Sequence, residues 1–237
     1  MEEKVSKRLM TRALSLVVVL FFGLSLWTPS VLAGDKTEAN QLVEKAKMTF
    51  ENFVKDKNMR VMVDLLKDAK GVFIAPQVLR GAFVVGASGG SGVFIARDKD
   101  NRWSGPAFYT LGSVSVGFQV GGDASEVILV AMTERGVKAF HSTNFKLGAD
   151  AGVAVGPAGA GIAAQTANLS ADIVSFSRAK GLYVGLSLDG AVVAARDDLN
   201  RSFYGKEAKP SDILGKPGFS NPKASGLLQE VARAAKK

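Results

Sequence analysis

The sequence has no cysteine and only one histidine, His141, among its 237 residues. The absence of cysteine excludes a disulfide framework, thiolate metal sites, cysteine nucleophiles and a cysteine-linked lipid anchor. A single histidine excludes multi-histidine metal sites, and it allows a serine–histidine pair only if His141 belongs to that pair. The chemistry that remains open is carboxylate chemistry, or binding without catalysis.

Nucleotide-binding motifs are missing as well. No G-x-x-x-x-G-K-[ST] run occurs, which excludes a P-loop, and no G-x-G-x-x-G run opens a helix. Aromatic residues make up 8% of the chain and do not interleave with basic ones, as they do on surfaces that bind single-stranded nucleic acid. Nucleic acid is therefore not expected as a partner.

Two short motifs resemble functional sites weakly. Gly86 to Gly90 fits the G-x-S-x-G pattern around Ser88, but a strand follows where a hydrolase elbow needs a helix, so we interpret it as a glycine-rich turn. Asp197 and Asp198 adjoin Arg196, which favours an ion-paired turn over a cation site. We predict no catalytic residue, no metal site and no cofactor, and hence no enzyme.

The N-terminus has the pattern of a targeting segment. Four basic residues precede an apolar stretch from Ala13 to Trp27, and the small-residue site Val31-Leu32-Ala33 follows. We predict a signal peptide over residues 1–33 that is cleaved after Ala33, which would place the mature chain in the periplasm of a Gram-negative host. The alternative is an uncleaved membrane anchor, although the stretch is shorter than the roughly 20 residues of a membrane span.

Helices are expected at both ends of the mature chain. Apolar residues recur at three- and four-residue spacing over residues 36–57 and predict an amphipathic helix; they are Leu42, Val43, Ala46, Phe50, Phe53 and Val54. This face either packs on the protein's own core or lies on a membrane between flanking lysines. A second helix is expected over residues 59–68 and a last one over residues 223–236.

From Gly71 to Ala195 the apolar period changes to two, which predicts a series of strands. We expect Pro76 to close the first strand and Ser88 to Gly92 to connect the next two. Residues 113–121 alternate and predict a half-buried strand, and residues 126–132 predict a strand buried on both faces. Asp189-Gly190 predicts a type I′ hairpin turn.

Together these elements predict an α+β fold. N-terminal helices would pack on a curled, glycine-rich antiparallel β-sheet or barrel-like sandwich, and a C-terminal helix would end the chain. Glycine is frequent, with 26 residues, and glycine within strands permits the bends that such a sheet needs. Residues 34–237 contain no linker long enough to divide them, so we expect a single domain.

Several blocks of the sequence resemble the SYLF lipid-binding domain family. The run AKGVFIAPQVLRGAFVVGASGGSGVF, residues 69–94, is similar to the opening of that domain. The later blocks follow in the family's order and cover WSGPAFY at 103–109, GSVSVGFQVG at 112–121, EVILVAMTERGVKAF at 126–140, residues 147–155, and residues 182–205. The resemblance extends over about residues 36 to 215.

The resemblance implies a non-catalytic domain that binds lipid at a membrane surface. In eukaryotic members a basic, amphipathic N-terminal segment contacts the membrane, which implies lipid-binding roles here for Lys45, Lys47, Lys55, Lys57, Lys70 and Arg80. The signal peptide and the absence of an SH3 or FYVE module make actin and phosphoinositides unexpected partners, so anionic phospholipid of an envelope is the expected ligand. An outer-membrane β-barrel or an envelope structural protein is the alternative function.

Overall fold

The structure is a computed structural model that describes residues 31–82, 85–116, 121–156, 171–179, 182–183 and 188–236. The chain divides into two units, Met1–Gly34 and Asp35–Lys237, and the described strands all lie in the second. Residues 1–30 of the expected signal peptide lie outside the described residues, so its cleavage stays a prediction. Asp35–Lys237 contains both hydrophobic clusters described below, and hence the core that this unit needs to fold by itself.

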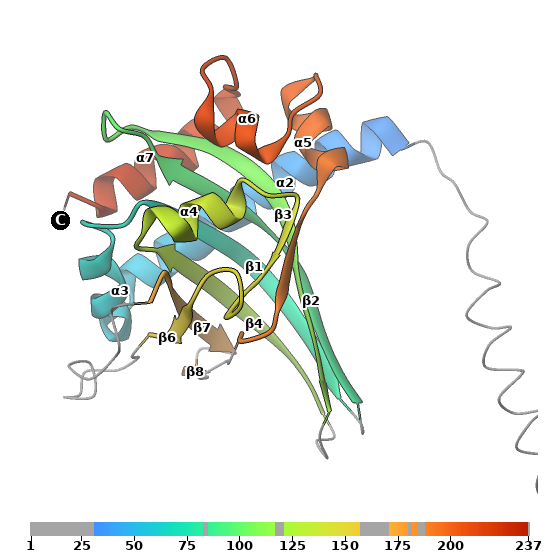
Figure 1. The fold of residues 1–237 in the computed structure, drawn as a ribbon, viewed down its shortest axis with the longest axis vertical. Helices are drawn as coiled ribbons and strands as arrows, with labels where there is room; N and C mark the ends of the chain where they lie inside the picture. The colour runs from blue at the N-terminus through green and yellow to red at the C-terminus, as the bar shows by residue number, and fades with distance from the viewer. Residues whose placement is uncertain are drawn as a thin grey trace, which may run out of the picture. The chain divides into compact units, whose positions relative to one another are not determined.

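The helices lie at the two ends of this unit and between its strands (Figure 1). In chain order they are α2 (Val31–Lys55), the 3₁₀ turn η1 (Lys57–Met59), α3 (Arg60–Leu65), α4 (Glu134–Phe140), α5 (Asp197–Tyr204), α6 (Pro210–Gly215), the 3₁₀ turn η3 (Pro222–Ala224) and α7 (Ser225–Ala234). The three helices expected from the sequence are present, although the second is shorter than predicted.

The described strands form one sheet in the order β5-β9-β3-β2-β1-β4-β7-β6, with β8 paired to β7. Their bounds are β1 (Gly71–Ala82), β2 (Val85–Arg97), β3 (Trp103–Val116), β4 (Gly121–Ala131), β5 (Asn144–Lys146), β6 (Val153–Val155), β7 (Ile173–Ala179), β8 (Leu182–Tyr183) and β9 (Val192–Ala195). All described pairs are antiparallel except β6 with β7. The expected α+β class with a curled, mainly antiparallel sheet is confirmed (Figure 1).

Each face of the sheet has its own hydrophobic cluster. On one face, which we call the α2 face, Ile74, Val93 and Phe108 pack with helices α2 and α7. On the other, the α4 face, Phe73 and Phe94 pack with α4 and the β5 region. Alternate residues of the central strands therefore face opposite cores, as the period of two requires.

The sequence predicted that Pro76 closes the first strand, and this prediction is wrong. β1 continues to Ala82, and its register against β4 shifts between Ala75 and Val78. A proline cannot donate a ladder hydrogen bond, and a bulge is a position in a sheet that tolerates this loss. β1 therefore pairs with both β2 and β4 on each side of the bulge.

The expected connection at Ser88 to Gly92 is also wrong, because β2 runs straight through it. A Cβ atom on Gly92 would lie 2.4 Å from the Phe73 ring, and one on Gly90 would lie 2.1 Å from the Gln77 carbonyl oxygen. The glycines therefore let β2 approach the bulged β1 closely rather than turn the chain.

Asp189-Gly190 forms a turn, but not of type I′. The turn is closed by a hydrogen bond from the Ala191 amide to the Leu188 carbonyl, 3.0 Å long. Gly190 has a φ of +81°, whereas Asp189 is not among the described residues with positive φ. Type I′ needs positive φ at both central residues, so the geometry instead fits a type II turn.

Candidate functional site

Helix α2 packs on the sheet with its apolar face, so the core interpretation of the helix over residues 36–57 is correct. Phe50 is 1% exposed and Phe53 is fully buried. Both belong to the cluster that joins α2 to β1, β2 and α7. These phenylalanines are therefore not available to a membrane in this conformation.

A partly buried network of ion pairs and hydrogen bonds connects α2 to the sheet. Arg178 on β7 donates from Nε to the Glu126 carboxylate on β4 at 2.9 Å, and its Nη1 lies 3.6 Å from Asp56 Oδ2. The Arg178 guanidinium also lies 5.0 Å from the centre of the Phe53 ring. Thr49 on α2 donates to the other Glu126 oxygen at 3.2 Å. Arg178 and Glu126 thus connect β7 and β4 to α2 and to Asp56, the residue that follows α2.

The four helix lysines named from the sequence have different surroundings. Lys47 and Lys55 both pair with Glu51, at 3.8 Å and 3.5 Å, as neighbours one helical turn away. Lys57 is exposed in η1. Lys45 is exposed on α2, and no ion-pair partner for it occurs among the described residues. Lys45 and Lys55 both line surface hollows, and of these two only Lys45 lacks an ion-pair partner among the described residues.

The remaining two predicted lipid-binding residues lie on β1 or just before it. Lys70 pairs with Glu134 of α4 at 3.1 Å, next to the start of the strand. Arg80 lies near the other end of β1, directly opposite Asp123 of β4. The six residues do not gather into one basic patch, and their role in lipid binding stays a prediction.

Two shallow hollows follow the line where α2 lies along β1. One, of about 300 Å³, is lined by Lys45, Leu79 and the Pro76 bulge among others. The second, of about 360 Å³, shares Lys45 and adds Met48, which is 56% exposed. A cation without a described partner therefore stands between two exposed apolar side chains at the edge of α2.

Beyond α2 the sheet continues, and none of the described helices lies over that part of it (Figure 1). One cross-strand row joins Ala124, Leu79, Gly89, Gly112, Val192 and Lys146. The next row toward the strand ends joins Gly122, Gly81, Ala87 and Val114. On β2 these rows contain Gly89 and Ala87, which are four and six residues from Val93. Because these are even separations, the rows continue the α2 face. We call these residues, apart from Lys146, the uncovered face.

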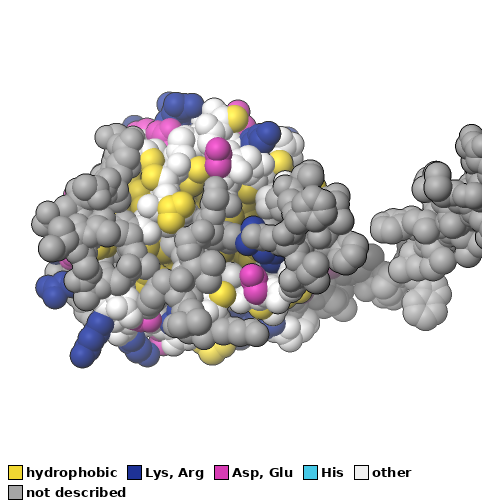
Figure 2. All heavy atoms as spheres, turned by 90° about the horizontal axis from the view of Figure 1, so that it is seen from below, with side chains coloured by type: hydrophobic (Ala, Val, Ile, Leu, Met, Phe, Trp, Pro, Cys, Tyr) yellow, Lys and Arg dark blue, Asp and Glu magenta, His cyan; other side chains and the backbone are white. Residues whose placement is uncertain are grey.

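The uncovered face is apolar and solvent-exposed. Val114 is 77% exposed, Leu79 56% and Val192 46%. A Cβ atom on Gly81 would meet no atom within 4 Å, and one on Gly112 would meet only a backbone oxygen at 3.6 Å. The alternation at 113–121 was expected to bury its valines; Val114 contradicts this, and residues 117–120 lie outside the described residues. Hydrophobic side chains are also visible on the molecular face shown in Figure 2.

The opposite side of the same strands is polar. The row between the two apolar rows joins Asp123, Arg80, Ser88 and Ser113. The Ser88 and Ser113 hydroxyls are 2.8 Å apart and form a hydrogen bond. Arg80 and Asp123 are cross-strand neighbours of opposite charge, an arrangement that stabilises a sheet. The distal part of the sheet is thus amphipathic, with one apolar and one polar side.

The largest described cavity, about 720 Å³, lies at the opposite end of β2. It is lined by the Arg97–Asn101 loop, Lys70, Glu134 and His141. Burial lowers the pKa of His141. Ser88 is eight residues away from Ala96 along β2, about 26 Å in an extended strand, so Ser88 and His141 form no catalytic pair. Acidic and basic groups alternate around this cavity without converging on one point.

Asp198 is ion-paired, as the sequence predicted, but Asp197 and Asp198 begin helix α5 instead of forming a turn. Arg196 donates from Nη2 to Asp198 at 2.7 Å, and its Nη1 reaches Glu38 of α2 and Ser91 of β2, both at 3.2 Å. The hydrogen bond from Arg196 lowers the pKa of Asp198, and Asp198 in turn raises the pKa of Arg196. Arg196 thus connects Asp198, helix α2 and strand β2 at the edge of the α2 face.

Within the described ranges, no group of three or more histidine, aspartate or glutamate side chains is placed to hold a metal ion. Among the helices described, none has the length and apolar character needed to cross a membrane. The arrangement offers surfaces for binding rather than a converging set of reactive groups.

Sequence reasoning missed the uncovered face. The alternation at Val114 was visible, but alternation alone does not tell whether the apolar side is covered. The glycines at 81, 89, 112 and 122 were a signal that could have helped, since a strand face without side chains gives a helix little to pack against. Their shared face becomes apparent only from the register of four strands.

Comparison with known proteins gives a consistent family match. The profile of the family described as "Ysc84: Las17-binding protein actin regulator" matches residues 112–234. SH3 domain-containing YSC84-like protein 1 of Homo sapiens is 34% identical over 152 residues, which are 63% of this chain and 44% of that protein. Protein YSC84 of Saccharomyces cerevisiae is 33% identical over 170 residues, 70% of this chain and 36% of that protein.

A further yeast relative, LAS seventeen-binding protein 3, is 33% identical over 155 residues, 64% of this chain and 34% of its own length. The chain therefore matches less than half the length of each of these curated relatives. The family description refers to binding and to actin regulation, and the name of the last of these relatives refers to binding.

Proposed function

Because the chain belongs to the Ysc84 (SYLF) family, a family of binding domains, we propose that it binds the surface of anionic phospholipid membranes without catalysing a reaction. The observation that carries the proposal is the edge of α2, where Lys45 stands between the exposed side chains of Met48 and Leu79. A cation beside exposed apolar side chains matches the boundary between anionic headgroups and acyl chains.

The charge of the chain supports the same proposal. Residues 34–237 carry 26 Lys and Arg and 20 Asp and Glu, a formal net charge of +6, which favours approach to an anionic surface at low salt. Each lysine near such a surface contributes about 1 kcal/mol, and this contribution falls off within a Debye length. The proposal includes a periplasmic location after cleavage at Ala33, supported by the basic and apolar N-terminal segment.

Sedimentation with vesicles tests this function on residues 34–237. Lys45→Glu should lower binding to vesicles that contain phosphatidylglycerol by roughly tenfold or more, because reversal changes two charge units at about 1 kcal/mol each. Lys99→Glu is the matched control, since Lys99 is equally exposed but lies in the loop after β2. Equal binding by Lys45→Glu and the unchanged protein would count against a role for this edge.

A protein-binding role is the second candidate, favoured by the printed description of the matching family as Las17-binding and actin-regulating. For this chain the expected signal peptide argues against actin as a partner. Co-sedimentation of residues 34–237 with filamentous actin separates the two candidates. Saturable pelleting with actin, together with no binding to anionic vesicles, would favour the protein-binding role.

A further inference from the structure

We propose that the uncovered face of the sheet, rather than the apolar face of helix α2, is the surface that lies against the membrane. This inference rests on the proposed function and assigns a place to it. Helix α2 covers the sheet over Val93 and Phe108 but not over Leu79 and Val114. The apolar period of the strands continues past the helix, and so exposes a surface that the fold itself does not bury.

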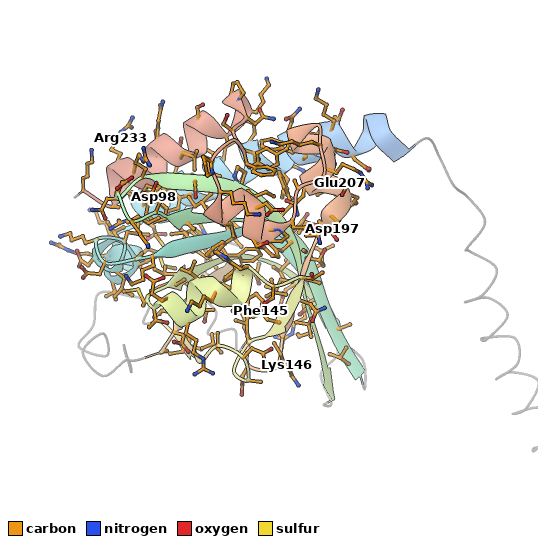
Figure 3. The ribbon with its side chains drawn as sticks, turned by 45° about the horizontal axis from the view of Figure 1, so that its top comes forward. Asp98, Phe145, Lys146, Asp197, Glu207 and Arg233 are labelled. Carbon is orange, nitrogen blue, oxygen red and sulfur yellow. The ribbon has the colours of Figure 1, made fainter. Side chains whose placement is uncertain are left out.

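The charge distribution favours a lipid surface as the occupant. The uncovered face carries no charged residue. Lys45 lines the hollow beside Leu79 together with Glu38, whose charge is paired with Arg196, and Lys146 ends the row that contains Val192. In Figure 3 Lys146 projects outward from β5, whereas its neighbour Phe145, 4% exposed, lies inside. Cations at the rim of an apolar surface match anionic headgroups around acyl chains.

The uncovered face is flat because it has few side chains, and a flat surface favours acyl chains over a second copy of this chain as its occupant. Four of its positions are glycines, and a Cβ atom at Gly89, Gly112 or Gly122 would meet only backbone oxygens, at 3.4 to 3.8 Å. Two protein sheets pack by interlocking side chains, which glycines do not provide. Fluid acyl chains need no such complement and can fill a surface of low relief.

The edges of the same strands limit how deep the uncovered face can lie in the membrane. β9 pairs with β3 as far as Gly112, and β7 pairs with β4 only from Ser125. Among the described strands, Ser113–Val116 and Gly121–Ala124, which lie beyond these points, therefore have a partner on one side only. Unpaired backbone groups are costly in hydrocarbon. The polar row with Arg80 and Ser88 on the other side also requires water, so the sheet lies flat at the headgroup boundary.

Adjacent residues on opposite sides of β2 give a matched test on residues 34–237. Ala87 lies on the uncovered face and Ser88 on the polar side. The double variant Val114→Asp/Ala87→Asp should bind phosphatidylglycerol-containing vesicles roughly 30-fold more weakly, since each charge against an anionic surface changes partitioning about fivefold. Ser88→Asp, which puts one such charge on the other side, should change this binding by a factor of about two or less.

A gain-of-binding variant keeps the test independent of folding losses. Gly112→Leu adds an apolar side chain to the face where there is room for it, and binding should rise by about tenfold. Val114→Trp should show a blue-shifted fluorescence that brominated acyl chains quench, whereas Ser88→Trp should not.

The outcomes separate this inference from the function on which it rests. If the unchanged protein does not bind anionic vesicles, the proposed function fails. If it binds but the double variant and Gly112→Leu bind equally well, the function stands and the assignment of the face is wrong. Equal losses for the double variant and Ser88→Asp, or a dimer in sedimentation velocity that Val114→Asp dissociates, would likewise overturn the assignment.

Discussion

Replacing Phe53 by alanine tests whether α2 belongs to the core. The Phe53 side chain is fully buried between α2 and the sheet, and the Arg178 guanidinium lies 5.0 Å from its ring centre. Removal of a fully buried phenylalanine leaves a cavity and lowers the free energy of unfolding by about 3 to 5 kcal/mol. For a unit of this size, that loss lowers the melting temperature by roughly 6 to 20 °C.

Urea denaturation of residues 34–237, followed by circular dichroism, measures this loss. Asn52→Ala is the control, because Asn52 is the exposed neighbour of Phe53 on the same helix, and a surface change of this kind should stay within about 0.5 kcal/mol. If Phe53→Ala lost less than about 1 kcal/mol, α2 would not be packed on the sheet. The helix would then again be a candidate for the membrane contact.

Three further predictions follow from the chain. Gly190→Val should lower the free energy of unfolding by about 1 to 3 kcal/mol because Gly190 has a φ of +81°, whereas Gly89→Val, which needs no positive φ, should not; an unchanged melting temperature would refute the turn. The pKa of Asp198 is lowered by its hydrogen bond from Arg196, so this group stabilises the fold above its unfolded pKa of about 3.9 and loses that effect as the pH falls through the folded value. Acid titration of stability should thus be shallower for Asp198→Asn below about pH 4, and parallel curves would contradict it. Mass spectrometry of the exported protein should find Gly34 first, and an intact Met1 terminus would indicate an anchor.

The sequence predicted those elements whose signal is local. The three- and four-residue spacing around Phe50 and Phe53 identified α2, and the apolar run at residues 126–132 identified β4, buried as expected from Val127 to Ala131. The α+β class follows from such signals because helical and strand periods occupy separate parts of the chain. Asp198 was paired as its neighbour Arg196 suggested.

Features that depend on strands far apart in sequence could not be predicted. Whether Gly90 and Gly92 turn the chain or admit a bulged neighbour depends on Gln77 and Phe73 across the sheet. The exposure of Val114 depends on where α2 ends relative to β3, which no residue of β3 encodes. For the same reason the six basic residues expected to act together prove to be distributed over α2, η1 and β1.

Partitioning of residues 34–237 between anionic and neutral vesicles tests the central claim most directly. The account predicts binding to vesicles with phosphatidylglycerol that exceeds binding to pure phosphatidylcholine vesicles. That preference should shrink as salt rises from 0.1 to 1 M, because the Debye length falls from about 10 Å to about 3 Å. A weak, salt-independent part should remain from the apolar face. Equal partitioning into both kinds of vesicle, or none into either, would contradict the claim.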